Sequence, residues 1–161
     1  MKKLLVLAAI IVAGVAANAA SFKWTGANIY ASNGTSKFNG SADLYAYLAT
    51  ADVSTAVKVD TATVVEGTIK DGSTTGRVFS DDSLASGTAY KFYFVIEDGG
   101  KQFTSAAKEA TGADVGATSI AFANQSSATQ ASGNWAAVPE PTSGLLMLLG
   151  VAGLALRRRH V

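Results

Sequence analysis

Few residues in this chain could do chemistry. It has no cysteine, and its single histidine, His160, lies next to the C-terminus. Thiol catalysis, iron–sulfur ligation and thiolate zinc sites are therefore excluded, and residues 20–137 hold no imidazole that could act as a general base. The sequence predicts a non-enzymatic protein with no catalytic residue, no metal site and no cofactor.

One serine–lysine pair has the spacing of an acyl-transfer site. Ser105 and Lys108 match the pattern Ser-x-x-Lys, which needs both side chains on one helical turn so that the amine can activate the hydroxyl. Ser105 lies in or next to a predicted strand, where residues three apart point to opposite faces. We therefore predict that this pair is not a site.

The acidic residues give a similar result. Asp81 and Asp82 could bind calcium together with Asp71, but neighbours on an extended chain diverge and no Asp-x-Asp-x-Asp-Gly loop is present. Residues 71–76, Asp-Gly-Ser-Thr-Thr-Gly, lack the Gly-Lys-Ser/Thr of a phosphate-binding loop. We expect solvated turns at both places.

The elements that would position a site are predicted to be strands. Apolar and β-branched residues gather in short runs separated by Gly, Asn and Asp, and no proline precedes Pro139. This spacing is typical of an all-β protein, and we expect a single small β-sandwich, immunoglobulin- or fibronectin-like, over residues 20–124. The runs cover 22–30, 44–50, 62–69, 77–79, 89–97, 102–107 and 118–123.

Two of these runs are informative. Residues 89–97 are apolar on both sides and predict a central, buried strand, which Asp98, Gly99 and Gly100 would turn into a hairpin ending near residue 107. Residues 44–50 are ambiguous, because Leu44, Tyr47, Leu48 and Ala51 also fit one helical face with Ser41 as N-cap. The shortness of the run and its β surroundings favour a strand.

Aromatic residues could also bind sugars. Several tyrosines sharing one open face would stack on sugar rings, although the commoner use of such residues is core packing. Residues 20–137 carry eight basic and eleven acidic side chains, a net charge of −3, which argues against nucleic acid as a partner. The aromatic candidates are Trp24, Tyr30, Tyr45, Tyr47, Tyr90 and Tyr93.

The N-terminus has the pattern of a cleaved signal peptide, residues 1–19. Lys2 and Lys3 precede an apolar run over 4–15, and Ala17 and Ala19 fit the small-x-small rule of signal peptidase. Twelve apolar residues are short for a membrane span, which needs about 20. We expect cleavage after Ala19 and export of the protein.

The C-terminus carries a second address. Residues 125–137 predict a flexible linker because they hold few bulky residues. Val138, Pro139, Glu140 and Pro141 then form a stiff joint. An uncharged run over 142–156 follows, predicted as a marginal transmembrane helix of roughly 22 Å against a core of about 30 Å. The chain continues with Arg157, Arg158 and Arg159, which the positive-inside rule keeps cytoplasmic.

The tail over residues 138–161 resembles the PEP-CTERM sorting signal, since Pro-Glu-Pro, the apolar run and the arginines occur in its order. The resemblance implies recognition by a membrane protease-transferase called exosortase, a Gram-negative type of envelope, and a surface or extracellular-matrix destination often associated with exopolysaccharide and biofilm. The expected partners are signal peptidase, an exosortase-like enzyme, the membrane before processing and exopolysaccharide. A structural or adhesive role is favoured, with a surface carbohydrate-binding module as the alternative.

Overall fold

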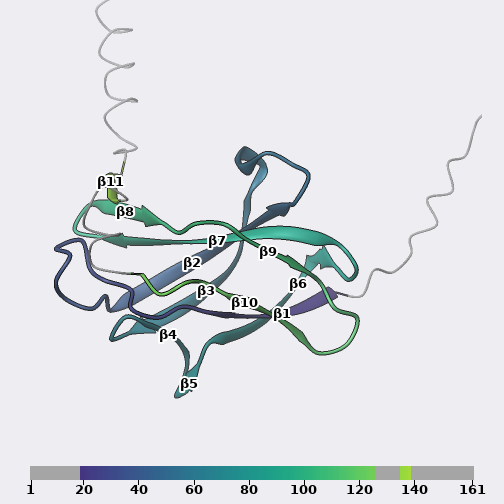
Figure 1. Ribbon diagram of the computed structural model, residues 1–161, viewed down its shortest axis with the longest axis horizontal. Helices are drawn as coiled ribbons and strands as arrows, with labels where there is room; N and C mark the ends of the chain where they lie inside the picture. Colours follow the sequence, from purple (N-terminus) through teal and green to yellow (C-terminus); the bar gives the residue numbers. More distant parts are fainter. Residues whose placement is uncertain (1–18, 126–134, 139–161) are drawn as a thin grey trace, which may run out of the picture.

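The computed structural model describes residues 19–125 and 135–138, which form two β-sheets that pack against each other (Figure 1). The smaller sheet has the order β10-β1-β6, with β1 (Ala19–Thr25) between β6 (Arg77–Ala85) and β10 (Ala117–Ala121). β1 pairs antiparallel with β6 and parallel with β10. The prediction of an all-β protein is confirmed, and the immunoglobulin- or fibronectin-like strand order stays a prediction.

The larger sheet has the order β11-β8-β7-β2-β3-β4-β5, and β9 also pairs with β7. A short 3-10 helix, η1 (Val53–Thr55), lies in the loop between β2 and β3, which projects from the sheet (Figure 1). The strands are β2 (Gly40–Leu48), β3 (Val57–Val65), β4 (Thr68–Asp71), β5 (Thr74–Thr75), β7 (Ala89–Asp98), β8 (Lys101–Thr104), β9 (Lys108–Thr111) and β11 (Trp135–Ala137).

The predicted central hairpin is confirmed. β7 lies between β2 and the pair of strands β8 and β9, and it turns into β8 through Gly99 and Gly100, whose φ angles are 56° and 75°. This left-handed region is open to glycine at little cost. β7 is not buried on both sides, however: its even positions are buried, whereas Tyr93 and Val95 are only half-buried on the outer face. The apolar outer positions thus belong to a surface.

Aromatic rings from both sheets form the core. Phe22 of β1 lies 4.9 Å from Phe92 of β7, and Trp24 lies 6.4 Å from Phe94, measured between ring centroids. Phe122, which follows β10, meets Phe94 edge-on at 5.0 Å, the arrangement that aromatic quadrupoles favour. Trp24, Phe22, Phe92 and Phe94 are fully buried. Among the aromatic candidates, Trp24 and Tyr90 are therefore core residues.

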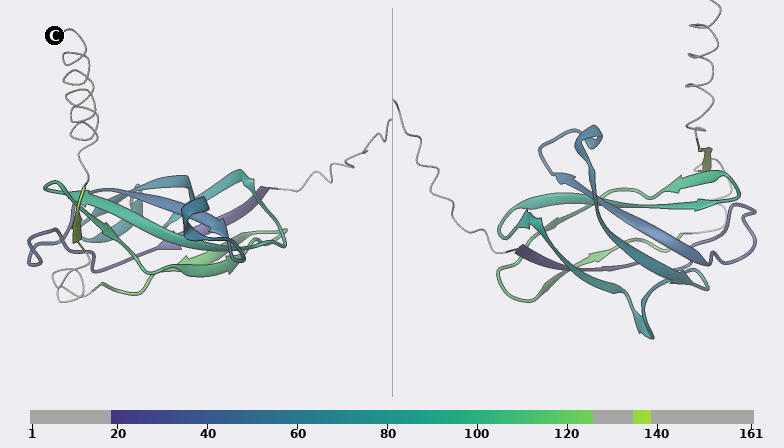
Figure 2. Two further views of the ribbon diagram at one scale, coloured as in Figure 1. Left: turned by 90° about the horizontal axis from the view of Figure 1, so that it is seen from above. Right: turned by 180° about the vertical axis from the view of Figure 1, so that it is seen from behind.

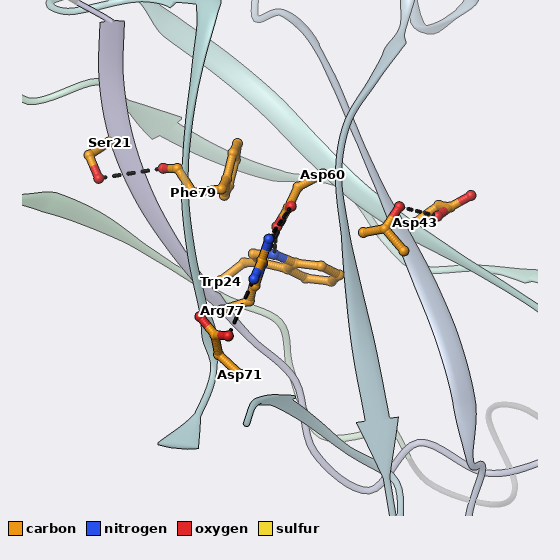
Figure 3. Close-up of polar contacts among 8 residues, drawn as sticks. Ser21, Trp24, Asp43, Asp60, Asp71, Arg77 and Phe79 are labelled. Atoms are coloured by element: carbon orange, nitrogen blue, oxygen red, sulfur yellow. Dashed lines mark hydrogen bonds and ion pairs between the residues drawn. The ribbon is translucent and has the colours of Figure 1, made fainter. Parts of the chain in front are cut away.

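A polar contact joins the two sheets beside this core (Figure 3). The buried indole of Trp24 donates from Nε1 to Asp60 Oδ2 of β3 at 2.9 Å. Arg77 of β6 donates from Nε to the same oxygen at 3.3 Å and from Nη1 to Asp71 at 3.3 Å. The hydrogen bond to Asp60, followed by its charge, raises the pKa of Arg77. We call Trp24, Asp60 and Arg77 the inter-sheet clamp.

The structure decides between the two alternatives for one segment and differs from the prediction for another. Residues 40–48 form strand β2, so the helical alternative for this segment is wrong. The range 125–137, predicted as a linker, includes strand β11 at its end, which pairs with the edge of β8. Trp135 is the reason, because its ring packs 5.8 Å from that of the buried Phe103.

Candidate functional site

The serine–lysine pair is not arranged for catalysis. Ser105 is buried, and its Oγ accepts a hydrogen bond from Phe94 N at 3.0 Å and donates to Ala106 O at 3.2 Å. Its own backbone N–H donates to Phe94 O at 2.9 Å. Lys108 is exposed at the start of β9, past a break in the strand. The hydroxyl therefore completes backbone pairing next to β7, where β8 has ended.

The acidic residues lie apart. Asp81 accepts from Ser83 N at 2.8 Å and from the Ser83 hydroxyl, whereas Asp71 faces Arg77. In the part of the chain that the structure describes, no group of three His, Cys, Asp or Glu side chains could hold a metal ion. The hydrogen bonds between Asp81 and Ser83 are typical of a turn.

Three tyrosines share the outer face of the larger sheet. Tyr45 and Tyr47 stand at alternate positions of β2, and Tyr93 is the register partner of Tyr45 on β7. The rings of Tyr45 and Tyr93 are stacked at 5.3 Å and 6°, and Tyr47 lies 6.3 Å from Tyr93. Partial burial, and then the neighbouring tyrosines, raise the pKa of Tyr93. We call Tyr45, Tyr47 and Tyr93 the tyrosine face.

The tyrosine face is flanked by two hollows. The first, of about 390 Å³, is lined by Tyr45 and Tyr93, by Gln102 and Thr104 of β8, and by Val53 of η1. Val53 is 54% exposed, so the η1 loop offers an apolar side chain to this hollow. An aromatic floor beside side-chain amide and hydroxyl groups can contact both the apolar faces and the hydroxyls of a sugar ring.

The second hollow, of about 280 Å³, is polar and shares Tyr45, Val95 and Gln102 with the first. Three carboxylates line it, and its lining includes no lysine or arginine. Two of them have partners from other segments of the chain: Asp43 meets Lys58 at 3.2 Å, and Asp98 accepts from Ser32 N at 2.6 Å. The third, Glu97, accepts from Gln102 at 3.4 Å. Carboxylates that retain free lone pairs can accept hydrogen bonds from hydroxyl or amino groups.

The structure describes one predicted residue of each terminal signal. Ala19, at the predicted signal cleavage site, begins β1 and pairs with Ala85. Val138, the first residue of the predicted sorting joint, follows β11 directly, and its N–H donates to Gly100 O at 3.1 Å. The other predicted residues lie outside the described residues: Ala17, Pro139, Glu140, Pro141, the run 142–156, Arg157, Arg158 and Arg159.

The tail over residues 137–159 matches the family described as the PEP-CTERM protein-sorting motif. The chain ends in a PEP-CTERM sorting motif. This motif indicates an exported protein with an exosortase-type processing partner, whose C-terminus is anchored in the membrane before sorting. In the described ranges, no helix is long and apolar enough for a membrane span. No curated protein and no solved structure matches the chain.

Sequence reasoning missed two features of these sites. It named the tyrosines but could not assign three of them to one face, because that depends on how β2 registers with β7. It also missed β11, although a signal was present: Trp135 is the one large apolar residue in the small-residue stretch 125–137. A lone tryptophan in such a stretch indicates a docking point, because its burial is worth more than that of its neighbours.

Proposed function

We propose that this protein is a non-enzymatic structural or adhesive component of the cell surface or extracellular matrix. The PEP-CTERM motif carries the proposal, because it marks an exported chain that exosortase processes. The domain in front of the motif supports it in a different way. The Ser105 hydroxyl and two of the carboxylates considered as calcium ligands, Asp71 and Asp81, are bound to neighbouring groups of the domain. The rest of the domain is a strand framework around an aromatic core.

Comparison of the C-terminal peptide in host strains with and without exosortase tests the sorting step. We expect the surface form to lack Arg157, Arg158 and Arg159 only where the enzyme is present. Replacing Pro139 and Pro141 with alanine should leave export intact and trap an uncleaved, membrane-bound form, since alanine lifts the restriction by which a residue before proline avoids helix. If the arginines remain attached in both strains, the tail is a permanent anchor and the sorting proposal fails.

The tyrosine face favours a second function, the binding of a polysaccharide at the surface. Three half-buried tyrosines form an aromatic surface, and Tyr45 and Tyr93 line hollows with hydrogen-bonding groups at their margin. The carboxylates of the polar hollow would repel uronic acids at the distances of direct contact. The proposed ligand is therefore a neutral or amino-sugar polysaccharide and not an acidic one.

Affinity electrophoresis with a neutral and a uronic-acid polysaccharide tests this binding. Retardation should occur in the neutral gel, and Tyr45→Ala with Tyr93→Ala should weaken it about tenfold, which corresponds to 1.4 kcal/mol. Tyr93→Phe keeps the ring and should retain most of the binding. Val78→Ala is the surface control, since Val78 is exposed on the smaller sheet. Equal retardation of the wild-type and double-alanine proteins would exclude the tyrosine face as the binding surface.

A further inference from the structure

The sorting motif begins inside the folded domain. The match to the motif starts at Ala137, which is the last residue of β11 and the register partner of Lys101. The next residue, Val138, bonds through its N–H to Gly100 O in the β7–β8 turn. The chain therefore has no spacer between the edge of the larger sheet and Pro139. The residues that precede the Pro-Glu-Pro segment are engaged in strand pairing.

The attachment of β11 to β8 rests on a small contact. β11 pairs over only three residues, and Ala136 and Ala137 are exposed. Trp135 supplies the packing through Phe103, but its indole Nε1 is buried without a hydrogen-bond partner among the described residues. A buried donor without a partner lowers the gain from burial. β11 is thus expected to open locally, well before the domain unfolds.

A processing enzyme must compete with β8 for this segment. Proteins commonly bind an extended peptide by main-chain pairing. The N–H of Val138 cannot donate to Gly100 O and to an enzyme's carbonyl at once, and the β8 edge occludes one side of the peptide. We propose that β11 is a latch: exosortase processes the molecules in which β11 has left β8. This inference rests on the proposed sorting and adds a step that precedes it.

A reversible lock tests the latch in the full-length protein in its host. Ala136 and Gln102 are register partners on the outer side of the sheet, and antiparallel partners lie within disulfide range. Because the chain has no cysteine, Ala136→Cys with Gln102→Cys can form only this intramolecular bond. We expect the oxidised double variant to accumulate uncleaved and dithiothreitol to restore processing. Each single variant, measured as a reduced monomer, is a matched control.

The opposite change should open the latch. Trp135→Ala removes the ring that packs on Phe103, and we expect the initial rate of processing to rise roughly tenfold, matching a 1.4 kcal/mol shift in the opening equilibrium. Hydrogen exchange at Val138 should accelerate by a similar factor, a readout that does not depend on exosortase.

The outcomes separate the latch from the sorting proposal. Processing of the oxidised double variant at the wild-type rate, or an unchanged rate in Trp135→Ala despite faster exchange, would overturn the latch while sorting stands. If the disulfide does not form, the Trp135→Ala rate decides alone. Loss of sorting itself appears differently, as a wild-type tail that stays attached whether or not exosortase is present.

Discussion

Two substitutions of Asp60 can separate the two contributions to the inter-sheet clamp, the indole hydrogen bond and the contact with Arg77. Asp60 accepts from the indole of Trp24, which is fully buried, and from Arg77, whose side chain is 36% exposed. Asp60→Ala removes both contacts. Asp60→Asn keeps a carbonyl oxygen for the indole. It removes the charge and replaces the second oxygen, which accepts from Arg77, with an amide group that cannot accept.

The expected magnitudes follow from these exposures. A buried indole N–H without an acceptor costs about 1 to 3 kcal/mol, whereas an ion pair to a partly exposed arginine contributes about 0 to 1 kcal/mol. Asp60→Ala should therefore lower the free energy of unfolding by about 1 to 4 kcal/mol. Asp60→Asn should lower it by about 1 kcal/mol or less, because the donor keeps its partner.

Urea unfolding of the processed surface protein, followed by far-ultraviolet circular dichroism, measures the difference. With a slope of about 2 kcal/mol per molar urea, Asp60→Ala should shift the midpoint by about 0.5 to 2 M, and Asp60→Asn should shift it by clearly less. Equal losses in both variants would show that the contact with Arg77, and not the indole hydrogen bond, dominates the clamp. Losses below about 0.5 kcal/mol in both, the range of ordinary surface substitutions, would refute the clamp altogether.

Three further predictions concern the core, the tyrosine face and export. Phe94→Ala should cost about 3 to 5 kcal/mol through lost burial and a cavity, and an unchanged urea midpoint would contradict its central place. The raised pKa of Tyr93 means that its stabilising effect is present below about pH 10 and is lost as pH rises above it. Absorbance titration should show that Tyr93→Phe removes a tyrosine that ionises above the ordinary tyrosine pKa. Ala19→Leu should block signal cleavage, and N-terminal sequencing of the wild-type surface form should begin at Ala20.

The parts of the fold that are local in sequence could be predicted. The hairpin predicted over residues 89–107 is confirmed over 89–104, because its turn needs glycine and only two residues separate its strands. The sorting motif is predictable for a similar reason, since its parts occur in order within one short tail. The prediction that β7 is buried on both sides was wrong. Its outer face is apolar because Tyr93 and Val95 line the first hollow there.

The parts that depend on distant contacts could not be predicted. The inter-sheet clamp joins Trp24 to Asp60, which is 36 residues away in sequence. No local pattern indicates which of the eleven carboxylates in residues 20–137 accepts from the indole. The tyrosine face needs Tyr45 and Tyr93 in register, and a slip of one residue would put Tyr93 on the buried side. β11 is stabilised by the contact of Trp135 with Phe103, and one tryptophan followed by two alanines carries no strand pattern of its own.

The position of the tail relative to the tyrosine face leads to a last prediction. β1 begins at one end of the two sheets, and β11 lies at the opposite end (Figures 1 and 2). The polar hollow lies at the β11 end, because Asp98 adjoins the β7–β8 turn whose Gly100 binds Val138. We therefore expect a membrane-held precursor to keep this hollow close to the lipid surface.

We expect processing to uncover the polar hollow. The trapped form with Pro139→Ala and Pro141→Ala should bind a neutral polysaccharide more weakly than the released protein while it is held in vesicles. In detergent the two forms should bind alike, since their tyrosine faces are identical and only the membrane differs. A pull-down of vesicles and of detergent-solubilised protein by the same immobilised polysaccharide measures both states. If the vesicle-held form binds as well as the detergent-solubilised form, the membrane does not shield the hollow, and sorting changes where the protein is without changing what it can bind.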